Sequence, residues 1–418
     1  MRARGLVGIS LVAALLGGCV GDIGAPSATK ASVPVASPLP PVIAIIDSEI
    51  NFYHSAFRSE FDWTSLLLQI PDATLFAPSA TPDLDVAREE DLPFLRSVPR
   101  GSLVAFEGTR LMGVSMLGDA SALLTGTSHG TSVAFAAANV SPHALVVVVQ
   151  VQASLCDPGA ACLVSETLAE AMEWVADQAW IDIVSLSAGL PADLPDHPAA
   201  HDEMRRFLEA SKRVHDAGKI IVNAAANEPT LTVTDYFGGP PWVLAVGGFQ
   251  GAPKGDTART SRGPDVVANY TQYVARSTGR DAYDWTEGTS FAAPVVAGTL
   301  AEAMWLVRSQ SGSTSEAPPR QAWRDALNAT AVKFGPTDWS PTTEVANETY
   351  WEVFAKSVPV VFAPAQMGWG FVEAGQAGEI ARRVIENDLA IPPEKAGAAQ
   401  FQAQRQAVRE EYWSRVGP

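Results

Sequence analysis

The chain is short of basic residues. Its 418 residues contain 29 Lys and Arg against 46 Asp and Glu, so its formal net charge at pH 7 is −17. A chain this acidic repels phosphate, and nucleic acid is therefore excluded as an expected partner. Charged residues make up only 18% of the chain and hydrophobic residues 47%. This composition suits a globular protein with a sizeable core, and the length allows one large domain or two average ones.

The N-terminus lacks a hydrophobic run long enough to span a bilayer. Arg2 and Arg4 precede an apolar stretch at 6–16, which is too short for a settled transmembrane helix and indicates an export signal. The letters LGG stand directly before Cys19, and this arrangement resembles a bacterial lipobox, in which the cysteine is lipidated and becomes the mature N-terminus. An ordinary secretory signal with an incidental cysteine is the alternative.

The segment after this signal, 20–41, is rich in Gly, Ala, Ser and Pro and shows no periodicity, so we expect a flexible tether. Val20 is not an acidic retention signal. We therefore predict a signal peptide at 1–19 and a cell-envelope lipoprotein anchored to the membrane through Cys19. The outer membrane or the periplasmic face is the favoured location, and secretion is the alternative.

Cysteine is scarce, with three residues in the whole chain. With Cys19 assigned to a lipid, Cys156 and Cys162 remain, and the sequence DPGAA lies between them. An exported compartment permits a disulfide, and the Pro-Gly turn can bring the two thiols together. Two free thiols are the alternative. We expect no metal site here, because no other His or Cys lies nearby in the sequence.

Apolar strand patterns alternate with helical patterns along the rest of the chain, and no internal repeat is visible. This alternation predicts an α/β fold with a mostly parallel central sheet and helices on both of its faces. Strands are expected at 42–46, 144–151, 183–186, 219–224 and 242–248. Helices are expected from residue 129, at 165–178, 201–217, 290–307, 321–331 and 401–416.

Three polar residues stand at the ends of such elements. Asp47 follows the strand at 42–46, at the sheet edge where open α/β proteins place their sites. His129 opens an Ala-rich helix, and Ser290 opens a buried helix within the run GTSFAAP at 288–294. Backbone N–H groups and the positive end of the helix dipole favour a developing anion there, as a nucleophilic serine requires. Each residue taken alone also fits a simple cap or turn.

Taken together, the order Asp47, His129, Ser290 resembles the subtilisin-like serine protease (subtilase) family. Members carry a strand ending in Asp-Ser/Thr-Gly, then His-Gly-Thr, then Gly-Thr-Ser-x-Ala-x-Pro, and this chain matches with DS at 47–48, HGT at 129–131 and GTSFAAP. Further segments resemble family landmarks in the same order, at 183–189, 220–227, 242–248, 261–268 and 368–374. The resemblance implies a three-layer subtilisin-like fold.

The resemblance also implies a serine endopeptidase that hydrolyses peptide bonds of polypeptide substrates through an acyl-enzyme. Ser290 is then the nucleophile, His129 the general base and acid, and Asp47 the residue that orients the imidazole. Asn227 and the backbone N–H of Ser290 form the oxyanion hole. The implied substrate-binding residues are Ser187, Ala188 and Gly189 along the peptide, with Ala224, Ala225 and Ala226 around the first pocket. The chemistry requires no cofactor, and a structural calcium ion is possible although no ligands can be assigned.

Two departures from the family pattern lie beside the expected site. Glu49 stands where Gly usually follows Asp-Ser, and a left-handed turn there would cost about 1 kcal/mol with a side chain, so this loop is expected to differ. Ala226 stands where Gly usually precedes Asn227. Two alternatives to the endopeptidase therefore remain open: a transpeptidase, in which an amine intercepts the acyl-enzyme, and a non-catalytic surface binding protein on the same scaffold.

The resemblance also suggests a domain plan. We expect a peptidase domain at 42–385, with an insertion near 52–124 that borders the substrate cleft and a long segment near 309–367, followed by a helical extension at 386–418. Many secreted subtilases have a folded pro-region before the first catalytic strand. The tether at 20–41 is too short to bury a core, so we expect folding without a pro-domain or with help in trans.

Overall fold

The computed structural model describes residues 39–70, 72–152, 166–189, 202–227, 237–249, 264–311, 318–332 and 368–416. Cys19 and the tether up to residue 38, the pair Cys156 and Cys162, and most of the segment near 309–367 lie outside the described residues. The predicted lipidation and the predicted disulfide therefore stay predictions.

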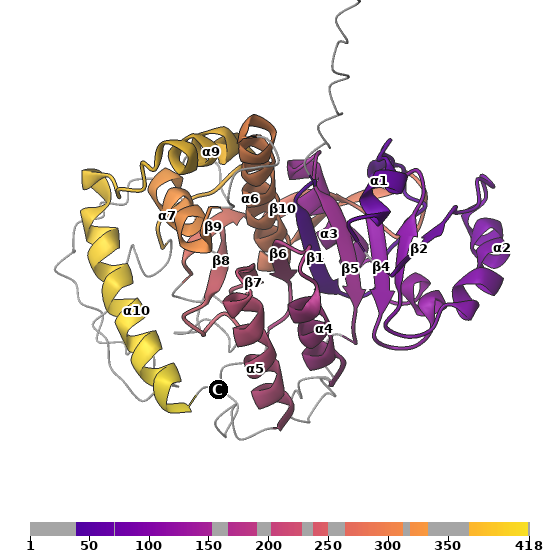
Figure 1. Ribbon diagram of the computed structural model, residues 1–418, viewed down its shortest axis with the longest axis horizontal. Coiled ribbons are helices and arrows are strands. Elements are labelled where there is room, and N and C mark those ends of the chain that lie inside the picture. The colour runs from indigo at the N-terminus through magenta and orange to yellow at the C-terminus, as the bar shows by residue number, and fades with distance from the viewer. Residues whose placement is uncertain are drawn as a thin grey trace, which may run out of the picture. The chain divides into compact units, whose positions relative to one another are not determined.

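Among the described residues, nine strands form one sheet in the order β2-β3-β4-β5-β1-β6-β7-β8-β9 (Figure 1). Every neighbouring pair is parallel except β3 and β4. The strands are β1 (Val42–Asp47), β2 (Ala73–Phe76), β3 (Leu103–Phe106), β4 (Leu111–Ser115), β5 (Leu145–Gln150), β6 (Ile183–Leu186), β7 (Ile220–Ala224), β8 (Val243–Phe249) and β9 (Val266–Asn269), with a separate antiparallel hairpin of β10 (Thr271–Ala275) and β11 (Tyr283–Glu287). The mostly parallel sheet predicted from the sequence is confirmed.

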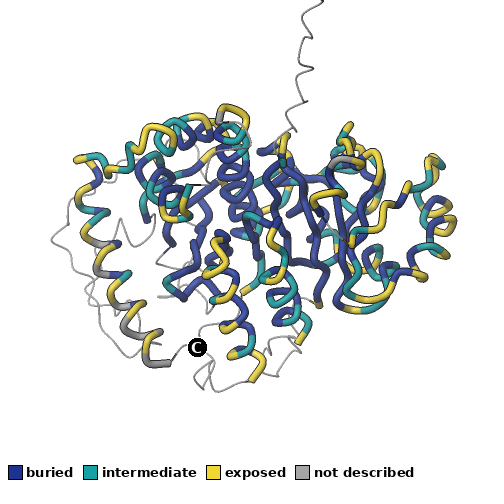
Figure 2. The backbone as a smooth tube through the Cα atoms, viewed as in Figure 1, coloured by how far each residue is buried: buried dark blue, intermediate teal, exposed yellow. Residues whose placement is uncertain are grey.

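Helices cover both faces of this sheet. They are α1 (Trp63–Leu67), α2 (Leu84–Ser97), α3 (His129–Val140), α4 (Glu166–Asp177), α5 (Asp202–Asp216), α6 (Thr289–Ser311), α7 (Arg320–Thr330), α9 (Ala377–Glu386) and α10 (Ala396–Val416), with single 3-10 turns η1 (Ser55–Phe57), η2 (Ala120–Leu124), η5 (Ala374–Gln376) and η6 (Pro393–Lys395). Contacts join α3 to α6 and α4 to α5, one pair on each face. Buried backbone runs through the sheet and through α6 (Figure 2).

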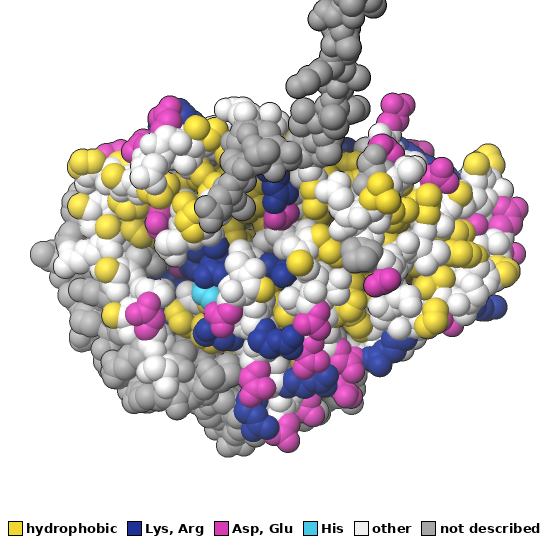
Figure 3. All heavy atoms as spheres, viewed as in Figure 1, with side chains coloured by type: hydrophobic (Ala, Val, Ile, Leu, Met, Phe, Trp, Pro, Cys, Tyr) yellow, Lys and Arg dark blue, Asp and Glu magenta, His cyan; other side chains and the backbone are white. Residues whose placement is uncertain are grey.

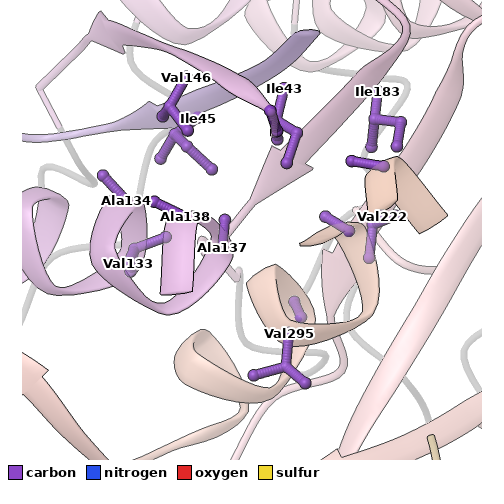
Figure 4. Close-up of a cluster of buried hydrophobic side chains, with 14 of the residues drawn as sticks. Ile43, Ile45, Val133, Ala134, Ala137, Ala138, Val146, Ile183, Val222 and Val295 are labelled. Carbon is purple, nitrogen blue, oxygen red and sulfur yellow. The ribbon is translucent and has the colours of Figure 1, made fainter. Parts of the chain in front are cut away.

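Side chains of the central strands alternate between the two faces, because successive residues of a strand point to opposite sides. Ile43 and Ile45 of β1 pack in one hydrophobic cluster with residues of α3 and α6. Figure 4 shows these two side chains beside Val146 of β5 and over Ala134 and Ala137 of α3. The alternate β1 residues, at 42, 44 and 46, belong to a second cluster with α4 and α5. A strand buried on both faces must be apolar throughout, which explains the run VIAII.

Strand β1 occupies the position at which the strand order reverses. Its neighbours are β5 on one side and β6 on the other, so strands β2 to β5 form one half of the sheet and strands β6 to β9 form the other half. Crevices at the carboxyl ends of strands at such a position are the usual ligand sites of open α/β sheets. Asp47 is the last residue of β1 and lies at this position.

The segment 52–124 extends the same sheet. Its strands β2, β3 and β4 add to the edge next to β5. It also holds the β10–β11 hairpin, because Arg280 donates hydrogen bonds to the carbonyls of Tyr53 and Ser79, and Arg88 donates to the carbonyl of Ser277. This hairpin leads directly into α6, so the segment anchors the chain that carries Ser290.

Helix α6 is the core helix of one face. Residues 289–310 are long and apolar enough to cross a membrane by length and composition. An 18-residue window within them has a mean hydropathy of 1.4, but 78% of that window is buried inside the protein. Its small residues permit a close approach to α3. A Cβ at Gly298 would lie 2.6 Å from the backbone oxygen of Ala137, so glycine is required there.

Candidate active site

Asp47 and His129 form a hydrogen-bonded pair at the carboxyl edge of β1. The Nδ1–H of His129 donates to both carboxylate oxygens of Asp47, at 2.8 and 3.0 Å. The backbone N–H of Ser48 donates to one of these oxygens at 2.7 Å, and Asp47 itself is 5% exposed. Since a carboxylate only accepts, the imidazole proton is on Nδ1, and Nε2 of the neutral ring is left as the basic nitrogen.

The surroundings of His129 favour its protonated form. Burial lowers its pKa, but the charge of Asp47 and the hydrogen bond to it, with a further contribution from Glu49, outweigh burial and raise the pKa above the ordinary value for histidine. The ring therefore holds a proton more strongly than a free imidazole does. A histidine with this environment suits a base that must stabilise the imidazolium it becomes.

The hydroxyl of Ser48 ties the end of β1 to the start of α3. Ser48 Oγ accepts the backbone N–H of Gly130 at 3.0 Å. The two segments approach so closely that a Cβ at Gly130 would lie 2.5 Å from the backbone oxygen of Glu49. Glycine after His129 is thus a packing requirement, and it fixes the distance between the strand that carries Asp47 and the helix that carries the histidine.

Ser290 is the second residue of α6, as expected for a serine at a helix N-terminus. Its backbone oxygen accepts a hydrogen bond from Ser187 Oγ at 2.8 Å, which joins α6 to the end of β6. The ring of the following residue, Phe291, lies 5.5 Å from the ring of His129 between centroids. No hydrogen bond joins Ser290 Oγ to His129 among the described residues. Contacts between nucleophile and base are often long before a substrate is bound.

Asn227 is fixed by the residue that precedes the serine. Its side-chain Oδ1 accepts the backbone N–H of Thr289 at 2.8 Å and the hydroxyl of Thr289 at 2.9 Å. Because Oδ1 is occupied in this way, the amide presents its NH2 group as the remaining donor. An oxyanion donor must be held in place before charge develops, and the two bonds to Thr289 hold this side chain in place; its role as that donor stays a prediction.

The two departures from the family pattern differ in backbone conformation. Ala226 has a positive φ of 64°, whereas Glu49 is not among the non-glycine residues with positive φ. The loop after Asp47 thus turns without a left-handed residue at Glu49, as expected from its side chain. The left-handed conformation occurs instead at Ala226, where it costs about 1 kcal/mol and directs Asn227.

The residues predicted to bind substrate lie next to these groups. Ser187, Ala188 and Gly189 directly follow β6, and their exposure increases along the segment. Ala225 is completely buried and its N–H is bonded to the sheet, and Ala224 is also buried, whereas Ala226 is partly exposed. Of the three alanines, Ala226 therefore presents the most surface. Their contacts with substrate stay a prediction.

Two features of the site were not predicted from the sequence. Thr289 lies in the recognised GTS run, but its role as the clamp of Asn227 depends on tertiary contact. Glu49 is 2% exposed beside the Asp47–His129 pair, and burial raises the pKa of its carboxyl. In the sequence, Glu49 differed from its surroundings in one respect, since it stands where members of the family usually have Gly after Asp-Ser. Among the described residues, no three His, Cys, Asp or Glu side chains are grouped to hold a metal ion.

Comparisons with known proteins agree with this architecture. The model of the subtilase family, Peptidase S8, matches residues 41–347. No curated protein matches the sequence. A mutant of the protease domain of PatA is 16% identical, with a TM-score of 0.50 over 85% of this chain and 99% of that chain. The prenylagaramide maturation protease PagA is 16% identical, with a TM-score of 0.48 over 83% of this chain and 95% of that chain.

The PatG macrocyclase in complex with peptide is also 16% identical, with a TM-score of 0.46 over 83% of this chain and 93% of that chain. At 16% identity, the likeness to the PatA domain shows the fold alone. The family match spans well over half of the sequence and includes Asp47, His129 and Ser290. The subtilisin-like three-layer fold predicted from the motifs is confirmed, and the chain belongs to the subtilase family.

Proposed function

We propose that the protein is an exported, lipid-anchored serine endopeptidase. The observation that carries the catalytic part is the hydrogen bond from His129 to Asp47, made at the same sheet edge to which Asn227 and Ser290 are tied. An imidazole held in one tautomer by a carboxylate can activate the hydroxyl of a serine at a helix N-terminus when a substrate brings the two groups into contact.

In the proposed reaction, Ser290 Oγ attacks the carbonyl carbon of the scissile peptide bond, and its proton passes to His129 Nε2. The carbonyl oxygen becomes an oxyanion that accepts hydrogen bonds from the Asn227 amide and the Ser290 backbone N–H. His129 then gives the proton to the leaving amine nitrogen as the C–N bond breaks. Water repeats the attack on the acyl-enzyme ester, and its proton returns to Ser290 through His129.

The catalytic proposal is tested with an unfolded protein substrate and the mature chain, with Ser290→Ala as the inactive variant. We expect fragments whose masses account for one added water per cleavage, and none with Ser290→Ala. Fragments joined to an added amine instead would identify a transpeptidase. Identical fragmentation by wild type and Ser290→Ala would contradict a role for the serine, and absence of any product would favour a binding protein.

The anchor is a separate part of the proposal and rests on the sequence before residue 42. We expect metabolic labelling with a fatty acid to mark the protein in a bacterial host, and Cys19→Ser to abolish the label. The matched control is Cys162→Ser, which removes a different cysteine and leaves the lipid label unchanged. Label that survives Cys19→Ser would exclude lipidation at this position.

A further inference from the structure

A cavity of about 750 Å³ lies at the end of the sheet away from the candidate active site. Its wall includes Trp242 and Asp265, which directly precede β8 and β9. These are the amino ends of parallel strands, whereas Asp47 and Ser187 stand at carboxyl ends. Helices α5, α7 and α10 supply the other walls. Cavities of this volume accommodate small-molecule ligands.

Cationic side chains line this cavity although the chain as a whole is acidic. Lys212 of α5 and two arginines of α7, Arg320 and Arg324, belong to its wall. Figure 3 shows Lys and Arg side chains gathered around a histidine between α7 and α5 on this face. The two arginines are one helical turn apart, so both project from the same side of α7.

Within the part of the chain that the structure describes, neither guanidinium group forms an ion pair. Among the described residues, no Asp or Glu oxygen lies within the 4.0 Å of an ion pair from Arg320 or Arg324. Arg324 donates one long hydrogen bond, of 3.5 Å, to the backbone oxygen of Pro241. Arg320 donates only to His215, at its backbone oxygen and at Nε2, the latter at 2.9 Å.

The acids of the cavity wall have other partners. Asp265 accepts hydrogen bonds from Arg405 at 2.5 Å and from the backbone N–H of Ala245 at 2.7 Å. Asp325 accepts from Gln321 at 2.7 Å, and Glu410 accepts from Gln406 at 2.9 Å, so these two carboxylates keep their negative charge. Lys212 is paired with Asp216 at 2.7 Å, outside the wall. Among the described residues of the wall, Arg320 and Arg324 are therefore the cations that lack an ion pair.

His215 adds no charge at neutral pH. Because a guanidinium can only donate, Nε2 of His215 accepts from Arg320 and the ring proton is on Nδ1. Burial and the nearby charges of Arg320 and Arg324 lower the pKa of His215 to about 4. Burial also lowers the pKa of both arginines, and in Arg320 the charge of Arg324 adds to this effect, whereas the charge of Asp216 on Arg320 and that of Asp265 on Arg324 act in the opposite direction. A partly buried charge without an ion pair is costly, and a bound anion that pairs with it lowers that cost.

We propose that this cavity binds a small molecule through a phosphate or carboxylate group held by the guanidinium groups of Arg320 and Arg324. Guanidinium forks match the oxygens of both anions, and hydrogen bonds to a charged group are stronger than neutral ones. Trp242 and Trp369 border the same space and give the remainder of the ligand an apolar wall. The site is independent of the catalytic chemistry, because it stands at the opposite strand ends.

Calorimetric titration of the full mature chain tests this site. One arm uses inorganic phosphate and pyrophosphate, and the other uses citrate, at an ionic strength of about 0.15 M that screens weak surface attraction. We expect saturable binding with one site per chain in at least one arm. The arm with the higher affinity identifies the anion as phosphate or carboxylate.

Arg324→Gln and Arg320→Gln should each weaken binding by about ten- to a hundredfold, the range for losing hydrogen bonds to a charged group. The matched control is Arg205→Gln on α5, whose ion pair with Asp202 is exposed. Arg320→Lys keeps the charge without the fork and tests the same group if a glutamine variant fails to fold. Absence of saturable binding by all three anions up to about 1 mM, or equal binding by Arg324→Gln and Arg205→Gln, would overturn the proposal.

Discussion

Removal of the Thr289 hydroxyl should slow turnover without weakening substrate binding. Thr289 is 1% exposed and gives Asn227 Oδ1 two hydrogen bonds, one from its N–H and one from Oγ1. Thr289→Val keeps the shape and the N–H bond but removes the bond of 2.9 Å from the hydroxyl. A neutral hydrogen bond contributes about 0.5–1.5 kcal/mol. If the amide loses that much stabilisation of the position in which it donates to the oxyanion, kcat should fall by about two- to twelvefold.

The upper limit of this effect is complete loss of the amide. Asn227→Ala should lower kcat by about 10² to 10³, a range that is known from the corresponding asparagine of subtilisin and is not worked out from this structure. KM should stay nearly constant in both variants, because the oxyanion exists only after attack on the carbonyl. The kcat of Thr289→Val must therefore lie between the kcat of the wild type and that of Asn227→Ala.

Steady-state kinetics with a fluorogenic peptide measure both constants. The matched control is Thr299→Val, since Thr299 is buried in the same helix and its hydroxyl donates to the Val295 carbonyl at 2.8 Å, within α6 and away from Asn227. It removes one buried hydroxyl without touching the site, and kcat should not change. Equal kcat values for the two valine variants, or a raised KM with an intact kcat in Thr289→Val, would refute the role of the clamp.

Three further predictions concern pH and packing. The raised pKa of His129 means that kcat/KM rises through a midpoint above about 6.5 as the ring loses its proton, and Glu49→Gln should move that midpoint down because a nearby negative charge is removed. Burial raises the pKa of Asp265, but its arginine partners hold it at about 2, so the stability that the carboxylate contributes is present above about pH 4 and lost as pH falls toward 2. In Asp265→Asn, the free energy of unfolding should depend less on pH in this acid range and should be lower at neutral pH by about 3–5 kcal/mol, as measured by denaturant titration. Unchanged stability would contradict the pairing of Asp265 with the arginines. Gly298→Ala should cost about 1–3 kcal/mol in the same assay, since the new Cβ meets the Ala137 oxygen, and a neutral effect would contradict the close approach of α3 and α6.

The parts of the fold that depend on local pattern were predictable from the sequence. The run VIAII before Asp47 is buried on both faces in β1, and the expected helices beginning near His129 and Ser290 are α3 and α6. The motifs also placed Asp47 and His129, which the structure joins by a hydrogen bond, and Ser290 at the start of α6, because strand ends and helix starts face the same crevice in a parallel sheet.

Features that depend on pairing between distant segments were not predictable. The strands of 52–124 include the short β2, whose apolar pattern is weak, and they join the sheet only through register with their neighbours. The Thr289 clamp requires β7 and α6 to meet, and a threonine before a serine gives no sign of that partner. The cavity lined by Arg320 and Arg324 lies where α5, α7 and α10 converge, and no segment of the sequence shows that convergence by itself.

The reactivity of Ser290 is the most direct test of the catalytic account. A fluorophosphonate probe should label the folded mature protein at Ser290, as located by peptide mass spectrometry, and labelling should be lost in Ser290→Ala and strongly slowed in His129→Ala. Wild-type protein that is folded by circular dichroism but does not react, or that reacts at the same rate without His129, would contradict an Asp47–His129–Ser290 triad.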